Sequence, residues 1–225
     1  MLICDLHVHT NFSKDGESSV EEILKKAEEV GLDVIAITDH DSIDGAKKAL
    51  SCTTSVLVIP GIEVSTRQGH LIILGVTELI PAGLDVVDTI EIARKMGALL
   101  ILPHPYHVWR HGVARRKKAG MGAVDAIETF NSRYIVGSAN RKAARIAKKL
   151  GKPCVAGSDA HHARFVGFGR TFIDAERDIP SILAAIRAGK LTCGGRQTPL
   201  RTYTHQSLNN TWRKIKRFTR RVHHR

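Results

Sequence analysis

The chain has 225 residues, of which 43% are hydrophobic and 25% are charged, and this length is enough for one large domain or an α/β barrel. No apolar run approaches membrane-spanning length and no signal peptide is visible, so we expect a cytoplasmic protein without membrane contact. The four cysteines form no Cys-x-x-Cys pair, which argues against a zinc ribbon and a disulfide framework. The formal net charge of +12 is uneven, because residues 179–225 hold 11 Lys and Arg residues and no acidic residue. This asymmetry predicts a polyanionic partner.

Short β-rich runs alternate with helical patterns along the chain. The first run, Leu2–Val8, precedes two overlapping capping boxes in Ser18-Ser19-Val20-Glu21-Glu22 and a helix that ends at Gly31. The nearly continuous apolar run Asp33–Ile37 is typical of a parallel strand covered on both faces. Further strands are expected at Val56–Ile62, Leu71–Leu74, Leu99–Leu102, Ala123–Ile127, Cys154–Ala156 and Thr171–Ile173, and further helices at Ser42–Leu50, Val86–Met96, Ala139–Leu150 and Ile179–Ala188.

The repeated order of strand and helix predicts a parallel sheet with helices outside it. The number of units favours an α/β barrel of about seven strands over an open sheet, and the active site of such a barrel lies at the C-terminal ends of its strands. We expect residues 1–195 to form this barrel. Residues 196–225 are expected to form a basic tail, with a short helix from Thr211 to Arg225.

Two histidines at the end of the first expected strand raise the question of a metal site. His7 and His9 are two residues apart, so their side chains point the same way in a strand, and Leu6 and Val8 share the other face. Two imidazoles on one face suit a metal ion. The alternative is a pair of half-buried histidines with no ligand.

Other potential ligands favour the metal site, because they flank nearly every expected strand. Asp159-Ala160-His161 repeats the spacing of His7-Val8-His9. The remaining residues of this kind are His40, Glu63, His70, His104 and Glu128. Since the strands of a barrel end at one edge, we expect these side chains to meet there and to bind metal.

The donor atoms of these side chains limit which metal ions can bind. All donors are nitrogen or oxygen, and such a set accepts Zn²⁺, Mn²⁺ or Fe²⁺. The donors are too many for one ion, and the two oxygens of Glu63 can bridge two ions. A multinuclear cluster suits phosphoester hydrolysis, because it lowers the pKa of water and neutralises charge on the phosphoryl oxygens.

Taken together, these motifs resemble the PHP family, named for polymerase and histidinol phosphatase. The resemblance covers roughly residues 1–195 and rests on His7-x-His9, Asp15-Gly16, Thr38-Asp39-His40, Gly61-Ile62-Glu63, His70, Pro103-His104-Pro105 and Gly157-Ser158-Asp159-Ala160-His161. It implies a distorted (β/α)7 barrel, a cluster of two or three divalent ions of Mn, Fe or Zn, and phosphoesterase activity.

The resemblance also implies a role for each residue. His7, His9, Glu63 and Asp159 match the ligands of a first metal, and Glu63 bridges to a second metal completed by His70 and His104. Asp15, His40 and His161 match a third set. Many relatives have histidine where this chain has Asp15, and a hard oxygen ligand favours Mn²⁺ or Fe²⁺ there. Asp159 and His161 are candidates for proton transfer to the leaving group, so the expected catalytic residues are Glu63, Asp159 and His161.

Substrate contacts are expected from four further residues. Arg133 is the first candidate for a phosphate clamp, and Arg164 is a second, with a solvated surface arginine as the alternative for each. Glu128 and Asn131 belong to a family motif that either binds metal or orients the substrate. A basic stretch, Arg115–Lys118, could steer an anionic substrate, although such runs are usually solvated.

The motifs are most similar to the branch of the family that acts on nucleotides and short oligonucleotides, and histidinol phosphate is the alternative substrate. The tail, residues 211–225, is predicted either to contact RNA or DNA or to pack on the barrel.

Two other classes of function are alternatives to a phosphoesterase. A non-catalytic nucleic-acid-binding subunit should have lost metal ligands, whereas every matched position here holds a competent residue. A metal-dependent amide hydrolase fits less well, because Glu63 and the Asp159–His161 pair favour a phosphoesterase.

Overall fold

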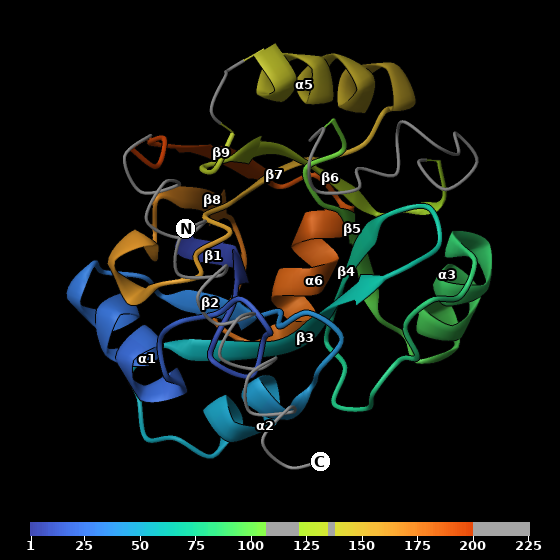
Figure 1. Cartoon of the computed structure of the whole chain (residues 1–225). Helices are drawn as coiled ribbons and strands as arrows, with labels where there is room; N and C mark the ends of the chain where they lie inside the picture. The colour runs from blue at the N-terminus through green and yellow to red at the C-terminus, as the bar shows by residue number, and fades with distance from the viewer. Residues whose placement is uncertain (107–121, 135–137, 200–225) are drawn as a thin grey trace, which may run out of the picture.

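The computed structural model of the chain describes residues 1–106, 122–134 and 138–199, and in this part a single mixed sheet curls into a nearly closed barrel (Figure 1). The spatial order of its strands is β7-β6-β5-β4-β3-β2-β1-β8-β9. The strands are β1 (Leu2–Val8), β2 (Val34–Ile37), β3 (Leu57–Ser65), β4 (His70–Leu74), β5 (Leu99–Leu102), β6 (Ala126–Asn131), β7 (Cys154–Gly157), β8 (Gly169–Ile173) and β9 (Leu191–Gly195). The helices are α1 (Val20–Glu29), α2 (Asp44–Leu50), α3 (Val86–Lys95), α5 (Ser138–Leu150) and α6 (Ile179–Arg187), with a 3₁₀ turn η2 (Ala163–Phe165). The expected α/β barrel is therefore confirmed.

The barrel closes where the segment after β7 meets the end of β1. The backbone N–H of Asp159 donates to the carbonyl of His7 at 2.8 Å, and the N–H of His9 donates to the carbonyl of Ala160 at 2.9 Å. These bonds place two motifs that are about 150 residues apart in the sequence side by side.

Two apolar clusters hold the barrel together. The outer cluster lies between the sheet and helices α1, α2 and α3, and includes Val8, Ile35 and Ile90. The inner cluster includes Leu6, Ile59, Ile72, Leu99, Ile182 and Ile186. Its last two members belong to α6, which lies in the centre of the ring of strands in Figure 1. Apolar side chains therefore fill one end of the barrel interior.

Along the inward faces of the same strands, the side chains change from apolar at one end of the barrel to polar at the other. On β3 the inward positions run from Ile59 through Gly61 to Glu63, because alternate residues of a strand share a face. On β4, which runs the other way, they run from Leu74 through Ile72 to His70. The interior is thus apolar around α6 and carries ligand-type side chains at its opposite end.

The prediction of an all-parallel sheet is wrong. Strand β4 is antiparallel to both neighbours, and β8 is antiparallel to β1 and β9. The connection from β3 to β4 is only residues 66–69, in which Thr66 N–H donates to the Gly69 carbonyl at 2.8 Å. A parallel crossover needs a dozen or more residues, so this turn makes a hairpin.

The bounds of several elements also differ from the sequence predictions. The capping box is confirmed at Ser19, whose side chain accepts from Glu22 N–H while its own N–H donates to the Glu22 carboxylate. Strand β6 begins later than expected and runs on to Asn131, and β9 was not expected. Beyond it, Thr198 N–H donates to the Ser132 carbonyl at 2.8 Å.

The division into a barrel and a tail stays a prediction. Residues 200–225 lie outside the described residues, as do the predicted helix Thr211–Arg225 and the basic stretch Arg115–Lys118. Within the described ranges, no helix is both long and apolar enough to span a membrane.

The inner cluster gives a prediction for stability. Ile186 is fully buried in it, so Ile186→Ala should lower the free energy of unfolding by about 2–5 kcal/mol, because it leaves a cavity next to α6. Leu79, which is 59% exposed, is the control, and Leu79→Ala should change the value by less than about 0.5 kcal/mol. Urea unfolding followed by circular dichroism measures both, and equal effects would show that α6 does not support the barrel.

Candidate metal centre

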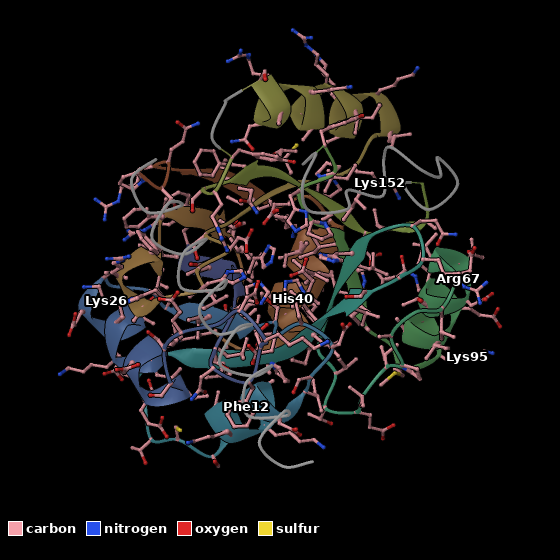
Figure 2. The ribbon with its side chains drawn as sticks, in the orientation of Figure 1. Phe12, Lys26, His40, Arg67, Lys95 and Lys152 are labelled. Carbon is pink, nitrogen blue, oxygen red and sulfur yellow. The ribbon has the colours of Figure 1, made fainter. Side chains whose placement is uncertain are left out.

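The nine predicted ligands lie close together at the polar end of the barrel interior. They are His7, His9, Asp15, His40, Glu63, His70, His104, Asp159 and His161. In Figure 2, His40 lies near the middle of the ring of strands, whereas Lys26, Arg67 and Lys95 lie at the periphery. Of the nine, only Asp15, His40 and His70 are more than slightly exposed to solvent.

Glu63 is at the centre of this group. Its side chain is only 1% exposed, and five imidazoles lie within 3.3 Å of its two oxygens. Oε1 faces His70 Nδ1 and His104 Nε2, each at 3.0 Å. Oε2 faces His7, His9 and His40, at 3.1, 3.2 and 3.3 Å respectively. The two oxygens thus have separate sets of nitrogen neighbours.

An irregularity in β1 turns His7 and His9 toward Glu63. The register between β1 and β2 shifts between Asp5 and Val8. As a result Leu6 belongs to the inner cluster but Val8 to the outer one, so the prediction that both share one face is wrong. The Nε2 atoms of His7 and His9 lie 3.1 Å apart.

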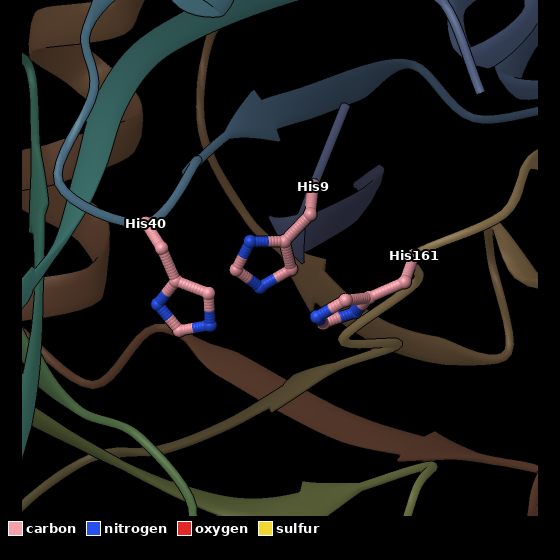
Figure 3. A group of neighbouring side chains, drawn as sticks. All are labelled: His9, His40 and His161. Atoms are coloured by element: carbon pink, nitrogen blue, oxygen red, sulfur yellow. The ribbon is translucent and has the colours of Figure 1, made fainter. Parts of the chain in front are cut away.

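Asp159 and His161 reach the centre from the segment after β7. Asp159 Oδ1 lies 3.4 Å from His9 Nε2, and His161 Nε2 lies 2.9 Å from Asp15 Oδ2. Figure 3 shows the rings of His9, His40 and His161 pointing toward one another from three separate segments. The ring centroid of His9 is 4.6 Å from that of His40 and 4.2 Å from that of His161.

The donor set fits divalent cations. Four groups of three side chains each place one nitrogen or oxygen atom per residue within 4.8 Å of the others: His9–His40–His161, His7–His9–Glu63, His7–His104–Asp159 and His40–Glu63–His70. Between two buried nitrogens 3.1 Å apart there is room for at most one proton, whereas a cation can accept both lone pairs. One ion rarely takes more than six such donors, so the set has enough for more than one.

Two of the predicted ligands have an unusual backbone. His104 has a φ of 27° and Asp159 a φ of 51°, a left-handed region that costs a non-glycine residue of order 1–3 kcal/mol. His104 N–H is held by Glu128 Oε2 at 2.8 Å, and Asp159 N–H by the His7 carbonyl. The surrounding hydrogen bonds therefore fix the two strained residues in place.

Glu128 and Asn131 are buried behind the centre. Glu128 Oε1 lies 2.9 Å from His7 Nδ1, and Glu128 Oε2 accepts from His104 N–H and from Asn131 Nδ2. Asn131 Nδ2 also lies 3.2 Å from Asp159 Oδ2. A Cβ at Gly157 would lie 2.5 Å from Glu128 Oε1 and 2.4 Å from His7 Cβ, so glycine is needed for this close approach.

The two predicted phosphate-binding arginines differ in position. Arg133 is 8% exposed, and its guanidinium contacts His161 Nδ1 and lies 3.6 Å from Asp159 Oδ1. Arg164 is exposed in η2, with its guanidinium 4.7 Å from the centroid of the Phe165 ring. In the described part of the chain, Arg133 reaches the centre and Arg164 contacts none of the predicted ligands.

No role was predicted from the sequence for two buried aspartates, Asp5 and Asp39. Asp5 accepts from Ser158 N–H at 3.0 Å and from Gly167 N–H at 2.8 Å, so it ties β1 to the segment after β7. Asp39 accepts from both the N–H and the hydroxyl of Thr10. The sequence signal that could have identified them is an aspartate within an apolar strand run. A carboxylate that is buried with such a strand requires hydrogen-bond partners.

The buried charges shift one another's pKa values. Burial by itself lowers the pKa of His9, but hydrogen bonds with Asp159 and Glu63 outweigh it and raise the pKa to about 9. The pKa of His7 is raised well above its ordinary value by Glu128 and Glu63, again against burial. For His161, burial and the neighbouring Arg133 lower the pKa to about 3. Nearby carboxylates therefore outweigh burial at His7 and His9, whereas burial dominates at His161 and at His40, where it lowers the pKa to about 4.

Curated relatives are similar to this chain over aligned segments of different length. An uncharacterized protein of Methanocaldococcus jannaschii is 34% identical over 171 residues, which cover 72% of this chain and 67% of the relative. A phosphoribosyl 1,2-cyclic phosphate 1,2-diphosphodiesterase of Eggerthella lenta is 34% identical over 48% of this chain and 41% of its own. A 5'-3' exoribonuclease of Haemophilus influenzae is 28% identical over 82% of this chain and 64% of its own. The chain thus spans about two thirds of the length of the archaeal relative and less of the two named enzymes.

Solved structures share the fold. A two-domain protein from Bacteroides vulgatus, described as containing a predicted PHP-like metal-dependent phosphoesterase, superposes with a TM-score of 0.70 at 21% identity, over 87% of this chain and 65% of its own. Endonuclease Q, in complex with a duplex bearing an abasic lesion, superposes with a TM-score of 0.66 at 18% identity, over 87% of this chain and 58% of its own.

The family models agree with the motifs read in the sequence. The PHP domain model matches residues 5–107, and the PHP-associated model matches residues 137–191. The chain belongs to the PHP family, and the two relatives named above as enzymes are hydrolases of phosphate esters.

Proposed function

We propose that this phosphoesterase hydrolyses nucleotides or short oligonucleotides at a cluster of two or three divalent cations. The observation that carries the proposal is the set of five imidazoles around the two oxygens of Glu63. Support for the substrate class comes from the relatives, one of which is named as an exoribonuclease and another as a cyclic phosphate diphosphodiesterase.

The distances support three sets of ligands. Glu63 Oε2 with His7, His9 and Asp159 forms the first set, and Glu63 Oε1 with His70 and His104 forms the second. The third set is Asp15, His40 and His161: Asp15 Oδ2 lies 2.9 Å from His161 Nε2, and His40 and His161 lie close together beside His9. The nitrogen and oxygen donors suit Mn²⁺, Fe²⁺ or Zn²⁺, and Asp15 favours the harder ions Mn²⁺ and Fe²⁺.

The side chains around this cluster then have separate roles. Bound cations would lower the pKa of water and neutralise the charge of the phosphoryl group. Arg133, beside Asp159 and His161, would hold a phosphoryl oxygen at the edge of the centre. Asp159 or His161 would assist the transfer of a proton from water to the leaving oxygen. Arg164 remains a candidate for substrate contact only.

Glu128 and Asn131 are better explained as positioning residues than as phosphate-binding residues. Their polar atoms are engaged by His7, His104 and Asp159. A carboxylate on Nδ1 of a ligand histidine fixes the tautomer in which Nε2 has a free lone pair. This revises the substrate-contact role predicted for these two residues.

A panel of substrates tests the proposed function. With the Mn²⁺-loaded protein we expect phosphate release from 3′,5′-bisphosphonucleotides and 5′-phosphorylated short RNA or DNA to exceed release from histidinol phosphate. The Glu63→Ala variant should lose both bound metal and turnover. Preference for histidinol phosphate would replace the proposed substrate class, and full turnover by Glu63→Ala would exclude the bridging role.

A chain ending at Pro199 tests the tail. Loss of oligonucleotide turnover with unchanged mononucleotide turnover would support contact between the tail and RNA or DNA.

Metal binding should release protons. His9, with a pKa of about 9, is protonated at pH 7.5 and must lose its proton to coordinate a cation. The apparent affinity for Mn²⁺ should therefore rise by up to about tenfold per pH unit from pH 7 to 9 and level off above pH 9. Calorimetric titrations in two buffers of different ionisation enthalpy measure the protons released. Binding without proton release at pH 7.5 would contradict the assignment of His9 as a ligand.

The role of Glu128 is separable from substrate binding. Glu128→Gln should weaken Mn²⁺ binding by about 10–100-fold, because it removes the charge that orients His7. Glu91→Gln, at an exposed position in α3 that pairs with Lys95, is the control and should bind metal as the wild type does. Metal content and Mn²⁺ titration provide the measurements. Unchanged metal binding with a raised KM would instead support direct substrate contact by Glu128.

A further inference from the structure

Helix α5 has an exposed basic face. Its sequence contains no acidic residue, and its five basic side chains are all exposed. At about 100° per residue these side chains fall within an arc of about 120°, opposite the buried Ala143 and Ala147. The basic face of α5 consists of Arg141, Lys142, Arg145, Lys148 and Lys149.

This face differs from the other helices in its lack of compensating charge. Lys26 pairs with Glu29 in α1, Lys48 of α2 with Glu21 of α1, and Lys95 with Glu91 in α3. Among the residues that the structure describes, the basic side chains of α5 form no ion pair. Their positive charges therefore add to one another and attract anions.

The basic face begins beside the metal centre. Asn140, in the first turn of α5, accepts from the backbone N–H of Asn131, whose side chain contacts Asp159. Lys142 Nζ lies 4.3 Å from the centroid of the Tyr106 ring, two residues after His104. From there α5 runs across the β6–β7 side of the barrel (Figure 1). The N-terminal end of the basic face is thus linked to the metal centre through Asn140 and the buried Asn131.

The dimensions of the helix suit a chain of phosphates. Thirteen residues make a helix about 20 Å long, and a strand with the rise of duplex DNA carries one phosphate per about 3.4 Å, or about six along α5. A mononucleotide at the metal centre is too short to extend along this helix. An anionic membrane is a poorer partner, because membrane-binding helices insert an apolar face, and Ala143 and Ala147 of α5 are buried against the barrel.

We propose that the basic face of α5 binds the sugar–phosphate backbone of a single-stranded nucleic acid whose end lies at the metal centre. The inference rests on the proposed function, since it assigns the part of an oligonucleotide substrate that lies outside the cluster. It predicts that longer strands gain affinity from α5 whereas single nucleotides do not.

The test compares two triple variants of the full-length, Mn²⁺-loaded protein. Arg141→Gln/Arg145→Gln/Lys149→Gln removes three charges from the basic face. Lys25→Gln/Lys47→Gln/Lys190→Gln removes three exposed charges elsewhere and is the matched control. For a 5′-phosphorylated single-stranded decamer, the first variant should raise KM by about tenfold and reduce the slope of log KM against log salt by about two. Its kcat, and its KM for a 3′,5′-bisphosphonucleotide, should stay within about twofold of wild type, and the control variant should match wild type throughout.

Binding measured without turnover separates this inference from the proposed function. Fluorescence anisotropy of a phosphorothioate decamer reports affinity even if the protein hydrolyses no nucleotide. Equal affinity of the wild type and the α5 variant would overturn the inference, and so would an equal rise of KM for the decamer and the bisphosphonucleotide. A loss of binding to phosphatidylserine vesicles with unchanged decamer binding would also overturn it, in favour of a membrane surface. If the protein hydrolyses only histidinol phosphate but decamer binding still depends on α5, the proposed substrate class is rejected. The nucleic-acid-binding surface on α5 is then still supported.

Discussion

The structure depends on the burial of one carboxylate, Glu63, among five histidines. A buried carboxylate is costly unless it is paired and hydrogen-bonded, and buried imidazoles beside it must share or lose protons. The pKa of Glu63 is accordingly held well below its usual range by the surrounding histidines, in spite of burial. Divalent cations would satisfy the same oxygens and nitrogens at once. The polar end of the barrel is therefore organised for positive charge at its centre.

Several departures from regular structure serve this arrangement. The shift in β1 turns His7 inward, the β3–β4 hairpin brings His70 opposite the end of β3, and the left-handed backbone at His104 and Asp159 aims two more donors at the centre. Each departure has local support from a buried hydrogen bond, such as that from Ser158 N–H to Asp5 or that from His104 N–H to Glu128. A strained residue persists only when its surroundings fix it, and here the Glu128 carboxylate holds His104 and the His7 carbonyl holds Asp159.

Charge is distributed over this molecule in two regions of different character. At the metal centre, carboxylates and imidazoles alternate and compensate one another within a buried volume. Along α5, cations stand together on an exposed surface with no acidic neighbour in the helix. The first arrangement suits small cations and the phosphoryl group that they bind, and the second suits the repeating charge of a phosphate backbone. Asn131 and Asn140 connect the two regions through two hydrogen bonds.

The sequence by itself determined the family, the barrel and which residues are ligand candidates. His-x-His, the Asp159–His161 pair and Glu63 are recognisable because strand periodicity and donor chemistry are local properties. Only the tertiary structure decided which side each ligand approaches, because this depends on contacts between residues distant in the chain. The sequence predicted a parallel sheet, and a four-residue turn made it mixed. It left open whether Glu128 and Asn131 bind metal or orient the substrate, and their partners His7, His104 and Asp159 emerge only when β1, β6 and the segment after β7 come together. Hydrogen bonds between such distant groups leave no periodic trace in the sequence, and for that reason the structure alone could reveal them.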